Sequence, residues 1–171
     1  MGSRRPPSWS ECDESTDLNL WTEPVRQFFQ YWLAIRPQGA LPGRQHFDPL
    51  HIYKIMSRVW ILDVVRADGD IRLKYRLVGT KEVDTLRQDV TGRWLDEVHP
   101  HLRESPGALD RYRHMVETGR ATYRKGPVIF THDPDHRMVE NCMAPMARDG
   151  QRVDMIAICS AQFLQNGKLA N

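Results

Sequence analysis

The sequence predicts one α+β domain with an antiparallel sheet, and three observations lead to this class. Two β-rich segments flank the turn at residues 67–70, and three more strands close the chain. Apolar residues at helical spacing precede the first pair of strands, and short helical patterns follow it. The chain has 171 residues, of which 40% are hydrophobic and 27% charged, as expected for a single globular domain.

The N-terminal part predicts a polar leader followed by an amphipathic helix. Residues 1–19 hold few large apolar groups, so we expect a flexible leader, and residues 20–46 are assigned to the helix and its loop. Thr22 can cap a helix over about residues 22–35, and Pro24 is tolerated in its first turn. Its apolar stripe must be covered, either by the domain's own sheet or by a second copy in a dimer interface. The stripe consists of Val25, Phe28, Phe29, Trp32 and Leu33.

The first two strands are predicted at residues 59–65 and 71–77, after a short helix that starts at Asp48-Pro49. The first is almost continuously apolar, as in a buried strand. In the second, apolar and basic residues alternate, which gives the strand one core face and one solvent face.

The second half predicts short helical turns, one longer helix at residues 105–118 and three strands. Gly119 fits the position just past the helix. The strands are expected at residues 123–131, 137–147 and 153–163, with turns between them.

Several stretches in this order resemble the PAS family, in particular the small stand-alone PAS proteins of α-proteobacteria. The most specific are the Arg-Leu-Val-Gly-Thr segment that ends at Thr80 and the Asp-x-Thr-Gly segment that ends at Gly92. The segment Leu86-Arg87-Gln88 departs from the family, because a glycine-containing turn is expected there. The other matching stretches are residues 47–50, 59–64, 93–97, 139–146 and 149–155.

The resemblance implies a five-stranded antiparallel sheet with helices on one face and a pocket between them, preceded by N-terminal helices. Residues 47–164 would form this domain and residues 165–171 a flexible tail. It also implies a non-enzymatic sensor or adaptor that binds a small ligand, a protein partner or both, without its own output domain. We expect a signalling partner and a homodimer. A small-ligand enzyme on an α+β scaffold and a purely structural dimerisation module remain as alternatives.

The fold and the strand alternation together predict a largely apolar pocket, although the same side chains would also suit a solid core. Flexible methionines and small residues would leave room for a small apolar ligand. The candidates are Leu73, Tyr75, Leu77, Met115, Val128, Phe130, Met143, Met155, Ala157 and Cys159.

Cofactor candidates are few. Haem-binding PAS domains use a histidine on a helix as axial ligand, and His114 lies on the corresponding helix, although the arginines around it favour a solvated face. Flavin photochemistry requires a reactive cysteine in a short helix. The dipeptide Asn141-Cys142 falls in a predicted strand instead, so we do not expect this chemistry.

Metal and catalytic sites are not predicted. His132 and His136 flank two aspartates, but in a turn where such residues are favoured by the backbone. The strand carboxylates Asp63, Glu140 and Asp154 are expected to face solvent or to pair with arginines.

Charge and composition exclude further classes. The net charge is +2, and arginines are interspersed with acids, so no basic stripe for nucleic acid forms. No apolar run approaches the length of a membrane span, and the N-terminus does not read as a secretory signal. Three irregularly spaced cysteines do not indicate a disulfide framework. We therefore expect a cytoplasmic protein.

Overall fold

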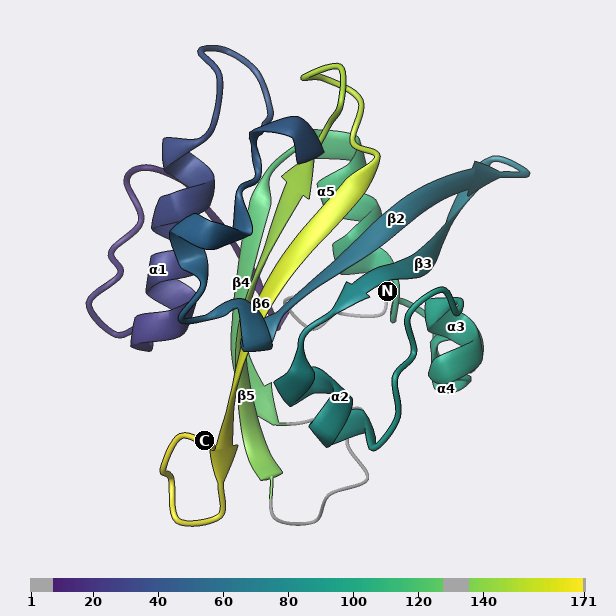
Figure 1. The fold of residues 1–171 in the computed structure, drawn as a ribbon. Helices are drawn as coiled ribbons and strands as arrows, with labels where there is room; N and C mark the ends of the chain where they lie inside the picture. Colours follow the sequence, from purple (N-terminus) through teal and green to yellow (C-terminus); the bar gives the residue numbers. More distant parts are fainter. Residues whose placement is uncertain (1–7, 128–135, 171) are drawn as a thin grey trace, which may run out of the picture.

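The computed structural model describes residues 8–127 and 136–170, and its centre is a six-stranded antiparallel sheet (Figure 1). The strand order is β1-β4-β5-β6-β2-β3, so chain-distant β2 and β6 are neighbours. The predicted class is confirmed, with one strand more than the five expected. The strands are β1 Ser10–Cys12, β2 Val59–Ala67, β3 Asp70–Val78, β4 Ala121–Pro127, β5 His136–Met146 and β6 Met155–Leu164.

Helices cover both faces of this sheet. Figure 1 shows α1 on one side and α2 to α5 on the other. We call the face under α1 the back face and the face under α2 to α5 the front face. The longer predicted helix begins five residues later than expected. The helices are α1 Glu23–Ala34, α2 Thr80–Leu86, α3 Leu95–Val98, α4 His101–Glu104 and α5 Asp110–Thr118, with short 3₁₀ turns at Arg44–His46, Pro49–Ile52 and Met56–Arg58.

The apolar stripe of α1 lies against the back face. Val25, Phe28 and Phe29 are fully buried, and Trp32 is almost fully buried, with its Nε1 donating to the Pro145 carbonyl oxygen at 3.0 Å. Leu33 is half-buried against the same core. Of the two covers expected for this stripe, the domain's own sheet is confirmed, and the alternative of a dimer interface formed by these residues is wrong. The homodimer itself stays a prediction.

A buried carboxylate anchors the start of α1. Glu140, on β5, is fully buried, and its two oxygens accept from the backbone N–H of Thr22 at 3.0 and 3.2 Å. The Tyr123 hydroxyl donates to the same carboxylate at 3.2 Å, and the Tyr123 ring stacks on Trp21. The expectation that Glu140 faces solvent is wrong. Its carboxylate accepts hydrogen bonds from a backbone N–H at the start of the helix, where water would otherwise be the acceptor.

Residues 10–12 and 165–170 are more ordered than the sequence suggested. Residues Ser10–Cys12, assigned to the flexible leader, form β1 and pair with β4. Glu11 binds His114 and Arg120, each at 2.7 Å. Near the C-terminus, Arg58 donates to the Ala170 carbonyl oxygen at 2.6 Å, so residues 165–170 fold back instead of forming a free tail.

Two backbone positions explain the sequence around α2. A Cβ on Gly79 would lie 2.4 Å from the Ser57 carbonyl oxygen, so only glycine fits between β3 and the preceding 3₁₀ turn. Arg87 ends α2 in the left-handed conformation, with φ at 56°. The expected glycine-like turn is therefore present, with an arginine in the position that glycine usually occupies.

No helix in the described part of the chain is both long and apolar enough to cross a membrane.

Candidate functional site: a cavity under the front helices

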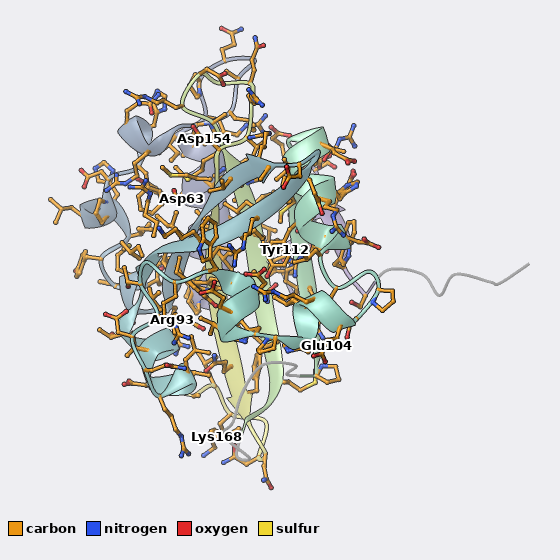
Figure 2. All side chains as sticks on the ribbon, turned by 90° about the vertical axis from the view of Figure 1, so that its right-hand side faces the viewer. Asp63, Arg93, Glu104, Tyr112, Asp154 and Lys168 are labelled. Atoms are coloured by element: carbon orange, nitrogen blue, oxygen red, sulfur yellow. The ribbon has the colours of Figure 1, made fainter. Side chains whose placement is uncertain are left out.

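A cavity of about 90 Å³ lies between the front face of the sheet and the helices α2 and α5. Tyr112, labelled near the centre of Figure 2, comes from α5. The volume exceeds what one water needs and is below the ~150 Å³ of a cavity that binds benzene. The lining side chains are Trp60, Tyr75, Val78, Glu82, Thr85, Leu86, His99, Tyr112, Arg124, Val139, Asn141, Met143, Ser160 and Gln162.

The Asp-x-Thr-Gly segment holds Tyr75 at this cavity. The Tyr75 N–H donates to the Arg93 carbonyl oxygen at 2.9 Å, and the Gly92 N–H donates to the Tyr75 carbonyl oxygen at 2.7 Å. Gly92 has a φ of 82°, which glycine adopts without strain. The Tyr75 hydroxyl lies 3.0 Å from His99 Nε2, and burial raises the pKa of this hydroxyl far above its ordinary value. Tyr75 therefore stays protonated.

A second polar group joins α2 to β6. The Thr85 hydroxyl donates to Gln162 Oε1 at 2.7 Å, and Gln162 Nε2 lies 3.5 Å from Glu82 Oε1. Burial raises the pKa of Glu82 to about 8, and the positive charge of Arg58 offsets part of that effect. Glu82 is thus mainly neutral at pH 7, so it contributes a proton donor to the cavity instead of a full negative charge.

Two arginines lie at the β4–β5 side of the cavity. Arg111 of α5 is buried and donates to Thr122 Oγ1, the Thr122 carbonyl oxygen and Asn141 Oδ1, at 2.8, 3.1 and 2.7 Å. Burial lowers its pKa to about 10, which leaves it charged. Arg124 lines the cavity itself, and its Nη2 donates to the Pro127 carbonyl oxygen at 2.8 Å.

Two of the ten predicted pocket residues, Tyr75 and Met143, line the cavity. Leu73 and Met115 are buried in the core outside the cavity lining, and Met115 Sδ accepts from Thr122 Oγ1 at 3.3 Å. Val128 and Phe130 lie outside the described residues.

An irregularity in the β2–β3 ladder explains why Leu77 is not in the lining. Ile61 pairs with Leu77, but the next residue, Leu62, pairs with Tyr75, so one residue of β3 is skipped. Such a bulge shifts the alternation by one. Val78 therefore lines the cavity, whereas Leu77 shares the side of Ile61.

The predicted face of β6 was the wrong one. Asn141 and Met143 line the cavity and pair with Ser160 and Ile158, so the even-numbered residues of β6 face the front. The odd-numbered predictions Met155, Ala157 and Cys159 therefore belong to the back side. The Cys159 thiol accordingly donates to the Pro24 carbonyl oxygen of α1.

The expected apolar pocket is instead mixed, and sequence reasoning missed most of its polar lining. Ser160 and Gln162 are polar residues two positions apart within a strand that is buried almost throughout. This spacing was a usable signal, since two polar groups on one buried face need partners there. Trp60 Nε1 donates to Ser160 Oγ at 3.0 Å, and Thr85 supplies the partner of Gln162.

His114 does not fit the role of haem ligand in this cavity. Its Nε2 lies 2.7 Å from Glu11 Oε1 and its ring lies 4.9 Å from that of Trp9, so it faces the N-terminal segment. The cavity-lining residue of α5 is Tyr112 instead. Within the described ranges, no cluster of three or more His, Cys, Asp or Glu residues suits a metal ion, and the predicted turn with His132 lies outside them.

Comparison with known proteins supports the family suggested by the motifs. No curated protein matches the chain. A family model described as "PAS domain" matches residues 21–152, which include α1 as well as the motifs around Gly79 and Gly92. The match covers well over half of the chain, and the sheet with its front helices is consistent with it. The chain therefore belongs to the PAS domain family.

Proposed function

We propose that this PAS protein is a sensor or adaptor in signal transduction that binds a small ligand in the front-face cavity. The cavity itself carries the proposal, because it combines apolar walls with a few placed polar groups, the usual character of a small-molecule site. PAS modules are typically sensory, which agrees with this role.

Association with a protein partner or a second copy would pass the signal on, and we place the protein in the cytoplasm. The helix α2 is the element best situated to respond, because three of its residues line the cavity and Gly79 fixes its start. A ligand changes partner affinity only if it favours one of two states of such an element.

The experiment is a metabolite panel scored by thermal shift and by native mass spectrometry of the full chain. Val139→Phe fills the cavity, and Val65→Phe, at a partly exposed position of β2, is the matched control. We expect a ligand that stabilises the wild type and Val65→Phe but not Val139→Phe. Equal binding by all three proteins would show that the ligand binds outside this cavity.

A small-ligand enzyme is the second candidate, and Glu82 is the observation that favours it. A carboxyl group with a pKa near 8 at a cavity is suited to acid–base work. Mass analysis of a bound ligand over several hours distinguishes the two. A sensor returns the ligand unchanged, whereas an enzyme converts it and Glu82→Gln stops the conversion.

A further inference from the structure

The β4–β5 wall of the cavity carries positive charge without a compensating carboxylate. Arg111 is only 7% exposed, and its described hydrogen-bond partners belong to Thr122 and Asn141, both neutral. Neither Arg111 nor Arg124 forms an ion pair with any carboxylate in the described part of the chain. Buried charges in proteins are ordinarily paired, because removal from water is costly.

Arg124 brings this charge to the cavity surface. It is the cross-strand partner of Asn141, whose Oδ1 accepts from Arg111, and the side chains of Arg124 and Asn141 both line the cavity. The Nε atom of Arg124 is buried and has no acceptor among the described residues. Of the buried polar side-chain atoms that lack a partner among the described residues, this is the one that belongs to the cavity lining, and a buried donor in that place calls for an acceptor.

The remaining lining supplies no negative charge near this wall. Glu82 belongs to α2 and contacts Gln162 of β6, and β5 separates that strand from β4. Arg58, whose positive charge lowers the pKa of Glu82, lies in the 3₁₀ turn before β2 and does not belong to the β4–β5 wall. The rest of the lining is mostly apolar and aromatic, and it includes Trp60, Val78, Leu86 and Met143.

We infer that the ligand of this cavity is a small carboxylate, whose apolar body lies against the Trp60–Met143 walls and whose charge lies at Arg124. This inference rests on the proposed ligand-binding function and names its chemical class. A guanidinium fork matches the planar carboxylate group and binds it through charge-assisted hydrogen bonds. The cavity of about 90 Å³ limits the body to a few carbon atoms.

The test compares isobutyrate with isobutyramide, which have nearly the same shape and differ in charge. Binding to the full chain is measured by titration calorimetry at constant ionic strength. We expect at least tenfold tighter binding of isobutyrate to the wild type. Arg124→Met should lose this preference, whereas Arg66→Met, which removes an exposed arginine from the same sheet, should keep it.

The stability of the ligand-free variant separates a binding role from a structural one. If Arg124 serves the ligand, Arg124→Met should unfold at the same temperature as the wild type or higher, because it removes an uncompensated charge. Arg124→Gln is the second variant, and it removes the charge while keeping hydrogen-bond donors. Unfolding of both variants would show a structural role and overturn the inference.

The remaining outcomes are also decisive. Equal binding of isobutyrate and isobutyramide, both abolished by Val139→Phe, would overturn the anionic ligand and leave the proposed function intact. Binding of inorganic phosphate without isobutyrate would overturn the carboxylate assignment. Binding of neither acid nor amide would overturn the inference as well, and the metabolite panel would then decide the proposed function separately.

Discussion

The buried charged side chains on the two faces of the sheet differ in the partners that they have. On the back face, Glu140 is fully buried, and its oxygens receive the Thr22 N–H and the Tyr123 hydroxyl under a well-packed helix. On the front face, Arg111 is buried among neutral partners and Arg124 keeps a donor without an acceptor in the described residues. The buried carboxylate of the back face thus receives its hydrogen bonds from within the chain, whereas Arg124 Nε on the front face has no acceptor among the described residues.

Under the proposed function, the same strands stabilise the fold on one face of the sheet and bind a ligand on the other. In β6, Cys159 contacts α1 on the back, and its neighbour Ser160 lines the cavity on the front. Because successive side chains point to opposite faces, substitutions one residue apart should act on different properties.

The largest effect is expected from the back face. Phe28→Ala removes a fully buried ring of α1 and should lower the free energy of unfolding by about 3–5 kcal/mol. Urea unfolding followed by circular dichroism measures this loss. Leu20→Ala, at an 88% exposed position, is the control and should change it by no more than about 0.5 kcal/mol. A loss below about 1 kcal/mol for Phe28→Ala would contradict the packing of α1 on the sheet.

The buried carboxylate should give the next largest effect. Glu140→Ala leaves the Thr22 N–H and the Tyr123 hydroxyl without their acceptor. A buried donor that loses its acceptor lowers the free energy of unfolding by about 1–3 kcal/mol. Because Tyr123 is only partly buried, its hydroxyl should cost near the lower figure, and we expect a total loss of about 2–4 kcal/mol in urea unfolding. Glu140→Gln keeps the shape and one acceptor and should lose less. If both variants unfold like the wild type, the back face does not depend on this carboxylate.

The smallest effect concerns pH and the front face. The pKa of Glu82 is about 8 in the folded protein and near 4.5 when unfolded. As pH rises from 4.5 to 8, the unfolded chain releases a proton that the folded one retains, so stability falls across this range and then levels. Glu82 is partly exposed, and we expect about 1–2 kcal/mol after solvent screening.

Thermal unfolding between pH 5 and 8 checks this behaviour against Glu82→Gln, which cannot titrate. The stability of the variant relative to the wild type should increase with pH. A constant difference between the two proteins would show that Glu82 is ionised throughout.

The sequence predicted the order of elements well, because that order depends on local patterns. Residues 67–70 carried hairpin chemistry, and the structure has its β2–β3 turn there. The stripe from Val25 to Trp32 was found by its spacing, and the domain's own sheet was one of its two expected covers. The spacing could not decide between the sheet and a second copy, since both require the same apolar surface.

The lining of the cavity was much harder to predict, because it depends on which way each strand faces. A strand buried on both faces, such as β6, gives no alternation to read. In β3, the bulge beside Leu62 moved Val78 into the cavity, although the sequence alternated cleanly through Leu77. Polar residues such as Asn141 can be assigned to the cavity lining only once their cross-strand partners are known.

The strand β1 has a consequence for how this protein must be handled. Its three residues occupy the hydrogen-bonding edge of β4, which would otherwise be open to a strand from another molecule. The hydrogen bond of Glu11 with His114 and its ion pair with Arg120 keep it there. Removal of residues 1–13 would therefore expose unpaired backbone N–H and C=O groups along β4. The truncated chain would then aggregate or form dimers through this edge, and such dimers would not represent the intact protein.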